Sequence, residues 1–178
     1  MEALPQLFMR HPDLSNIRPL LVPDDIQIVT HSPELISVWE DIIERAFEHH
    51  YSFDTTIQNS QDLVGDFNPE HCLYLKANDK IVATTTAIEN CNFPGEGYFH
   101  MVAADPDAQG KGYGKLIGLV ALHSLKDRGY KTAVLSTDDF RIPAIRAYLF
   151  LGFEPIYSHE SHQGRWEKVF SEIEKLKK

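Results

Sequence analysis

A glycine-rich loop ahead of an amphipathic segment is the part of this chain best suited to chemistry. It consists of Gln109, Gly110, Lys111, Gly112, Tyr113 and Gly114. Successive backbone N–H groups at the start of a helix form an anion site, and glycine lets a phosphate group approach because it has no Cβ. The loop therefore predicts a site for a phosphate or diphosphate, and Lys111 and Lys115 add positive charge beside it.

Two common phosphate-binding motifs do not match this loop. The Walker A pattern GxxxxGK[ST] does not occur in the chain. The dinucleotide-binding pattern GxGxxG is matched only loosely, by Gly112 and Gly114 with Gly118. That pattern should also follow the first strand of repeated βαβ units, whereas this loop follows four predicted strands. On the glycines alone, a plain glycine-rich turn is the remaining alternative.

The hydrophobic pattern predicts the elements that position this loop. Strands are expected at residues 26–29, 72–76, 81–89, 97–104 and 132–136, with a closing pair at 154–158 and 165–170. Helices are expected from Ser32 to about His50, at 61–64, from the glycine loop to Gly129, and from Pro143 to Gly152. This order predicts an α/β or α+β domain, with a mixed sheet and helices on its faces.

The chain is long enough for one domain, with 178 residues. We expect a proline-rich, irregular arm at 1–24, the domain at 25–170, and a short frayed helix at 171–178. A net charge of −9 argues against nucleic acid as a partner, and it suits either a cationic substrate or simple solubility.

The sequence also indicates the cellular compartment in which the protein is expected to act. It has no signal-peptide pattern at its start and no apolar run of about 18 residues, so no membrane span is predicted. Cys72 and Cys91 lack metal-site spacing and are expected to be reduced core residues, which points to the cytoplasm and to no bound metal.

Two motifs in sequence resemble the GNAT superfamily of N-acetyltransferases. The loop from Gln109 to Gly114 matches its Q/R-x-x-G-x-G/A signature. Residues 144–153 match its A-x-x-x-Y-x-x-x-G-F motif, beginning at Ala144 with the tyrosine at Tyr148. The resemblance covers about residues 25–170, and the N-terminal arm and residues 95–153 are similar to mycothiol-synthase-like members. It implies a mostly antiparallel sheet of six to seven strands, splayed between strands 4 and 5, with helices on both faces.

The resemblance implies transfer of an acetyl group from acetyl-CoA to a primary amine, on a small molecule or a peptide N-terminus. The amine attacks directly, through a tetrahedral intermediate. The pantetheine arm would pair with the backbone of Val102 and Ala104, and the diphosphate would sit on the amides of residues 109–114. Further coenzyme contacts are implied for Met101, Lys111, Lys115, Arg141 and Ala144. The lysines and Arg141 could meet phosphates or lie in solvent, and the family often forms homodimers.

Tyr148 matches the family tyrosine that lies close to the CoA sulfur, which makes it the candidate general acid. The alternative is a core tyrosine on an amphipathic helix. The position that often holds a glutamate base is Tyr98 here. Strand alternation places Glu96, Tyr98 and His100 on one face, together with residues 102 and 104. Glu96 or His100 is therefore the candidate base, acting through water, and the ordinary pKa of histidine near 6.5 suits proton transfer.

Two other functions remain open. Tyr98 at the usual base position favours a non-catalytic module that binds acyl-CoA, and a nicotinamide-dependent enzyme is a third alternative. The acceptor site is expected at the first helix and the loop at 51–70. His49 and His50 are expected to be surface histidines, and Asp138 and Asp139 could attract an ammonium group or cap a helix.

Overall fold

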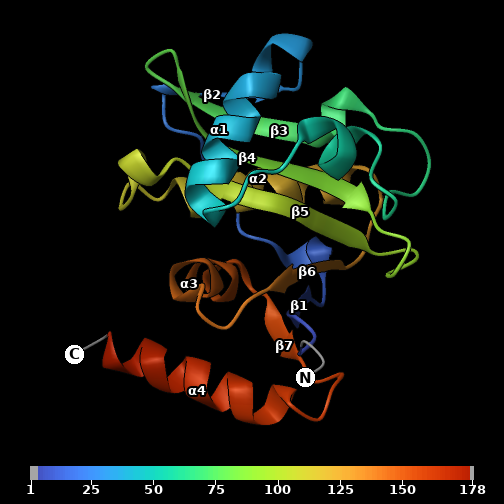
Figure 1. Cartoon of the computed structure of the whole chain (residues 1–178), viewed down its shortest axis with the longest axis vertical. Coiled ribbons are helices and arrows are strands. Elements are labelled where there is room, and N and C mark those ends of the chain that lie inside the picture. The colour runs from blue at the N-terminus through green and yellow to red at the C-terminus, as the bar shows by residue number, and fades with distance from the viewer. Residues whose placement is uncertain (1–3, 177–178) are drawn as a thin grey trace.

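A seven-stranded mixed sheet runs through the computed structural model, which describes residues 4–176 (Figure 1). Its strands are β1 (Leu7–His11), β2 (Ile26–Thr30), β3 (Cys72–Ala77), β4 (Lys80–Glu89), β5 (Gly97–Ala104), β6 (Ala133–Thr137) and β7 (Glu154–Ile156). The spatial order is β2-β3-β4-β5-β6-β1-β7, and every neighbouring pair is antiparallel except β5 and β6. The mixed, mostly antiparallel sheet predicted from the sequence is confirmed.

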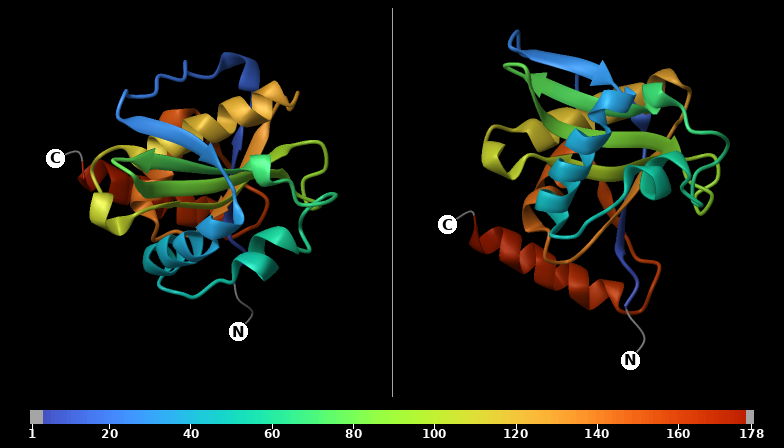
Figure 2. Two further views of the ribbon diagram at one scale, coloured as in Figure 1. Left: turned by 90° about the horizontal axis from the view of Figure 1, so that it is seen from above. Right: turned by 45° about the horizontal axis from the view of Figure 1, so that its top comes forward.

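Helices cover both faces of this sheet. The α-helices are α1 (Ile36–Phe47), α2 (Tyr113–Asp127), α3 (Ile142–Leu151) and α4 (His162–Lys175). Helix α1 lies over one face of β3 to β5, and α2 lies over the other (Figure 2). Helix α3 packs beside α2, where a Cβ on Gly118 would lie 2.5 Å from Leu151 Cδ1. Glycine therefore permits the close approach of these two helices.

Each face buries its own apolar cluster. Helix α1 contributes Trp39, Ile42 and Ile43, which pack with Phe53 and Tyr74. The larger cluster joins α2, α3 and α4 to the opposite face of the sheet. Each fully buried large apolar side chain contributes about 1.5–3 kcal/mol, so these clusters hold the helices on the sheet.

Several local expectations were wrong. The N-terminal arm is not irregular throughout, because β1 pairs with both β6 and β7 inside the sheet. Residues 165–170 form part of helix α4 rather than a closing strand, and this helix continues through the expected tail to Lys175. A π-helical turn, Asp54–Gln58, occurs in place of the short helix expected at 61–64. Cys91 is exposed rather than a core residue, and both cysteines are free.

A bulge in β5 overturns the predicted alternation along that strand. The register pairs Thr86 with His100 but Thr84 with Ala103, so β5 carries one residue more than β4 at this point. Met101 adopts a positive φ of 53° there. The extra residue reverses the facing of the later residues of the strand. Residues 102 and 104 therefore pack into the α2 cluster with Phe99, away from His100.

Asp105 joins the end of β5 to two other elements. Its side chain is fully buried, and its carboxylate oxygens lie 2.7 Å from Arg45 of α1 and 2.6 Å from Lys80 of β4. Burial alone would raise the pKa of Asp105, but hydrogen bonds from Arg45 and Lys80 outweigh it and hold the pKa well below its usual range. The carboxylate thereby holds the strand end from which the glycine loop departs.

We expect Asp105→Asn to lower the free energy of unfolding at pH 7 by about 1–3 kcal/mol, because hydrogen bonds to a charged group are lost. The pKa of Asp105 is lower in the folded state than the unfolded value of about 3.9, so the ionised carboxylate stabilises the folded protein at any pH above 3.9. This stabilisation decreases as the pH falls below about 3.9 toward the folded-state pKa. Urea denaturation at pH 7 and in acid measures both effects. Asp79→Asn is the control, because the Asp79 side chain is 96% exposed in its ion pair with Lys76. Equal losses in the two variants would contradict the assignment.

Candidate active site

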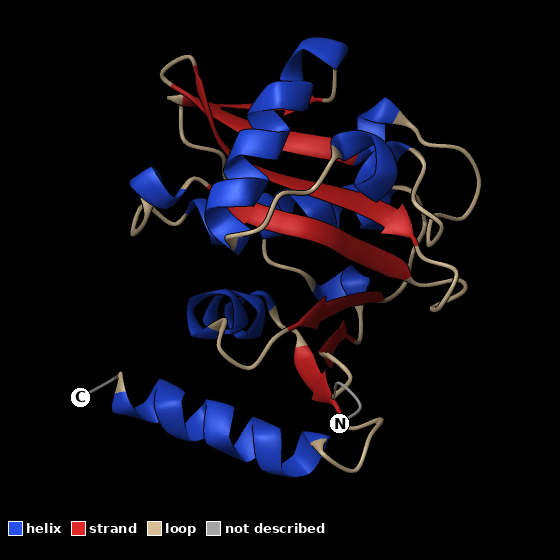
Figure 3. Cartoon of the chain, viewed as in Figure 1, coloured by secondary structure: helices blue, strands red, loops and turns tan. Residues whose placement is uncertain are grey.

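Strands β5 and β6 pair at one end and separate toward the other (Figure 3). Their parallel register covers Gly97, Tyr98 and Phe99 of β5, opposite Ala133 to Leu135 of β6. Met101 and Val102 are paired with no residue of β4 or β6 in the register. This separation lies between the strands that were predicted from the sequence as the fourth and fifth. They are β5 and β6 in the structure, because β1 was not predicted as a strand.

A cavity of about 280 Å³ opens where these strands separate. Its walls come from β5, β6, the residue before β1, the region around the start of α3, the last residue of α1 and the region that follows α1. They consist of Gln6, Phe47, Tyr51, Asp62, Tyr98, Phe99, His100, Met101, Val102, Leu135, Ser136, Thr137, Asp138, Arg141, Ala144 and Tyr148. The structure thus brings together six of the residues predicted to be catalytic or to bind the coenzyme: His100, Met101, Val102, Arg141, Ala144 and Tyr148.

The glycine loop lies beyond this cavity, between β5 and α2. Gly110 and Gly112 both have φ of 81°, a left-handed conformation that glycine adopts without strain. A Cβ on Gly110, Gly112 or Gly114 would meet nothing within 4 Å. Within the described chain, the five amides of residues 110–114 donate to no protein acceptor, since the first donor past Gln109 is Lys115. Unpaired amides beside open space fit a diphosphate.

The basic side chains near the loop have different surroundings. Lys111 is exposed, whereas Lys115 Nζ lies 4.4 Å from the centre of the Phe150 ring. Arg141 stands at the start of α3, stacks 4.0 Å over the Phe47 ring, and donates to Asp138 at 3.4 Å. Arg141 is therefore already held at the cavity wall, as a cation between an aromatic ring and a carboxylate.

Tyr148 of α3 lines the cavity and is 7% exposed. Burial raises the pKa of Tyr148, with the charge of Arg141 opposing this weakly. Its hydroxyl group has no hydrogen-bond partner among residues 4–176. The phenol is therefore protonated at neutral pH, and it can donate its proton to a group in the cavity.

His100 has one ring nitrogen engaged. Nε2 lies 2.9 Å from the main-chain oxygen of Thr56 in the π-helical turn. A carbonyl oxygen only accepts, so Nε2 carries the proton and Nδ1 of the neutral ring is the acceptor. Burial lowers the pKa of His100, and the hydrogen bond to Thr56 offsets this only in part. The ring is therefore neutral at pH 7, the form in which it can take a proton.

Glu96 and Tyr98 are both bound to protein partners. Glu96 precedes β5 and accepts two hydrogen bonds of 2.8 Å from Arg10 and one from Thr132. Burial would raise the pKa of Glu96, but these bonds lower it overall. The Tyr98 hydroxyl lies 2.8 Å from Ser136 Oγ, which links β5 to β6 at the mouth of the splay. Glu96 does not line the cavity, whereas Tyr98 does.

Sequence reasoning missed several cavity residues, among them Asp62 and Ser136. Residues 51–70 were expected to form the acceptor side, and Tyr51 and Asp62 do line the cavity. Nothing in the periodicity of that loop singles out Asp62. From the sequence, Asp138 could either cap a helix or attract an ammonium group. It also lines the cavity.

The described residues contain no cluster of three or more histidine, cysteine, aspartate or glutamate side chains arranged to hold a metal ion. Nor does any helix among them have the length and apolar content needed to cross a bilayer. The arrangement instead joins a loop of unpaired amides, a gap along the edge of β5, and a cavity lined by both Tyr148 and His100.

Comparisons with known proteins agree with this arrangement. The model of the acetyltransferase (GNAT) family matches residues 35–153, more than half of the chain. A mycothiol acetyltransferase of Thermomonospora curvata is 30% identical over 83% of this chain and 50% of its own length. One from Catenulispora acidiphila is 28% identical over 86% and 52%. The chain therefore spans about half the length of these curated relatives.

Solved structures show the same fold. A GCN5-related N-acetyltransferase from Sphaerobacter thermophilus has a TM-score of 0.67 at 22% identity, over 86% of this chain and 50% of that one. The ribosomal-protein-S18-alanine N-acetyltransferase from Escherichia coli has a TM-score of 0.60 at 22% identity, over 74% and 79%. With its splayed sheet, its loop of free amides and the match of the family model, the chain belongs to the acetyltransferase (GNAT) family.

Proposed function

We propose that this protein transfers an acetyl group from acetyl-CoA to a primary amine. The observation that carries the proposal is the row of free amides at residues 110–114, which follows the part of β5 that has no partner in β6 after one short turn. This geometry suits a diphosphate joined to an extended arm, because the arm can lie along a strand edge while the diphosphate meets a helix N-terminus. Acetyl-CoA supplies the reactive thioester when bound.

The chain's own groups then have distinct roles. Tyr148 donates a proton toward the leaving thiolate, and His100 takes a proton from the acceptor amine, directly or through water. Met101 and Val102 lie at the bulge and have no register partner in β4 or β6, and we assign their amides to the developing oxyanion. Glu96 serves the structure, through Arg10 and Thr132, because it lies outside the cavity walls.

The proposal predicts release of free CoA when the purified protein is mixed with acetyl-CoA and a panel of primary amines. A thiol reagent measures the product, and mass spectrometry identifies the acetylated amine. Release that needs no amine would indicate hydrolysis instead, and no release with any amine would contradict transferase activity.

Replacing His100 by glutamine is expected to lower kcat about 100-fold, since general base catalysis contributes at least that much. In the wild type, kcat/KM should fall as the pH drops below the pKa of His100, which lies under its ordinary value of about 6.5. His123→Gln is a matched control, because His123 Nε2 also lies 2.9 Å from a main-chain oxygen, that of Arg18. An unchanged kcat in the His100 variant would rule out its role as base.

A second candidate is a module that binds acyl-CoA without catalysis. It is favoured by Tyr98, which stands where the family often has a glutamate and whose hydroxyl is engaged with Ser136. This candidate predicts thermal stabilisation by acetyl-CoA with no CoA released across the amine panel. Measuring thermal stabilisation by acetyl-CoA together with CoA release therefore distinguishes an acetyltransferase from a module that only binds acyl-CoA.

A further inference from the structure

We propose that Asp62 binds the ammonium group of the acceptor amine before the proton is removed. The inference rests on the proposed function and adds a specificity residue to it. Asp62 lies in the segment that follows α1 and lines the cavity that also holds His100 and Tyr148.

The backbone around Asp62 is held in place. Its carbonyl oxygen accepts a hydrogen bond of 2.9 Å from the amide of Cys91. The next residue, Leu63, forms an isolated antiparallel bridge with Asn90 and packs against the apolar cluster that contains Tyr98. The carboxylate therefore projects from a segment fixed against the end of β4, although no regular strand or helix contains it.

Asp62 also differs from the other carboxylate of the cavity. Asp138 accepts hydrogen bonds from Gln6 at 3.2 Å and from Arg141 at 3.4 Å, so a cation already neutralises it. Asp62 is exposed and accepts one long hydrogen bond of 3.4 Å from Asn92. Within residues 4–176 it forms no ion pair. The cavity thus offers one negative charge without a cationic partner.

The charge of Asp62 lies close enough to His100 and Tyr98 to act on both. The negative charge of Asp62 raises the pKa of both Tyr98 and His100. At His100 the larger effect is burial, which lowers the pKa overall. An ammonium group held by Asp62 would therefore stand near the imidazole that takes its proton. A protonated amine has no lone pair for attack, so binding the cation beside a base joins recognition to activation.

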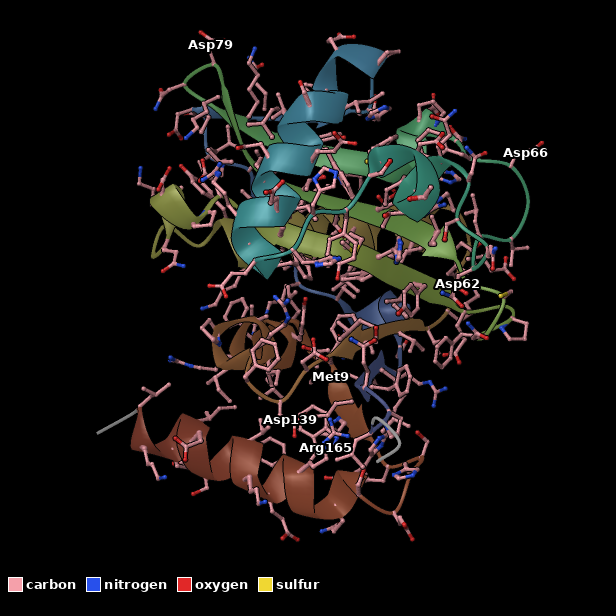
Figure 4. The ribbon with its side chains drawn as sticks, in the orientation of Figure 1. Met9, Asp62, Asp66, Asp79, Asp139 and Arg165 are labelled. Carbon is pink, nitrogen blue, oxygen red and sulfur yellow. The ribbon has the colours of Figure 1, made fainter. Side chains whose placement is uncertain are left out.

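Asp66 provides a matched control in the same loop. It is exposed like Asp62 but does not line the cavity. Figure 4 shows Asp62 near the place where β4 ends and β5 begins, and Asp66 farther out on the loop. Substituting either residue by asparagine removes one negative charge, so a general change in net charge affects both variants equally.

The test compares two series of CoA thioethers by calorimetry, which needs no turnover. One series carries a terminal ammonium (S-aminoethyl-, S-aminobutyl- and S-aminohexyl-CoA), and the other carries the matching neutral alkyl groups. We expect the wild type to bind one ammonium compound about two- to fivefold more tightly than its neutral partner, as expected for a partly exposed ion pair. Asp62→Asn should abolish the preference, and Asp66→Asn should retain it.

Each outcome is informative. If both series bind the wild type equally at every length, the role of Asp62 is overturned while coenzyme binding stands. A preference that survives in Asp62→Asn overturns it as well. If neither series binds to folded protein, the proposed function fails along with the inference. The preference should also shrink as salt is raised, since screening weakens an exposed pair.

Discussion

Replacing Gly112 by valine is expected to reduce acetyl-CoA affinity at least tenfold. Gly112 has φ of 81° and caps the start of α2. A β-branched residue in this left-handed conformation costs about 1–2 kcal/mol, so the loop would relax and move its amides. The new side chain would also occupy the open space above the loop, where a Cβ meets nothing within 4 Å in the protein. Calorimetric titration of acetyl-CoA into the variant measures the loss.

Gly129 at the other end of the same helix is the control for this substitution. It has φ of 92°, and a Cβ there also meets nothing within 4 Å. Gly129→Val therefore imposes similar strain without touching the loop, and it should lower stability while leaving affinity unchanged. Equal loss of affinity in both variants would show that strain in α2, rather than a blocked anion site, explains the effect.

Replacing Tyr148 by phenylalanine should lower kcat about 100-fold or more and leave acetyl-CoA affinity unchanged. The hydroxyl group has no partner among the described residues, so its removal breaks no hydrogen bond there and should not reduce stability. Initial-rate kinetics and calorimetry separate the two effects. Tyr157→Phe is the control, because Tyr157 is 54% exposed and does not line the cavity. Undiminished turnover in the Tyr148 variant would remove the proton-donor role.

Elements set by local chemistry could be predicted from the sequence. The turn between β3 and β4 contains Asn78 and Asp79, and both have the positive φ that these residues tolerate. Helix α2 ends before Gly129 and α3 before Gly152, each glycine being left-handed, as the glycine stop signal indicates. Such features depend on a few neighbouring residues, which is why a single sequence reveals them.

Elements set by distant partners could not be predicted in this way. Strand β1 is five residues long between proline-rich flanks, and its place between β6 and β7 depends on pairing across more than a hundred residues of chain. The bulge at Met101 exists only relative to β4, so strand alternation alone placed residues 102 and 104 on the wrong face. Helix α4 did carry a readable signal, because Trp166, Val169 and Ile173 recur at helical spacing.

The candidate site shows the same division. The glycine loop and Tyr148 were found from motifs, and the structure places Tyr148 in the cavity. Our proposal of His100 rather than Glu96 as the base rests on their hydrogen-bond partners, Thr56 and Arg10, and both partners lie far away in the sequence. Asp62 was missed because a loop has no periodicity to show which side chains face a cavity.

Calorimetric titration of acetyl-CoA into the folded wild-type chain tests the central claim most directly. We expect saturable heat with one coenzyme per chain, which competing free CoA suppresses and acetate does not. Folded protein that gives no heat with acetyl-CoA would contradict the assignment of the amides at residues 110–114 as a diphosphate site.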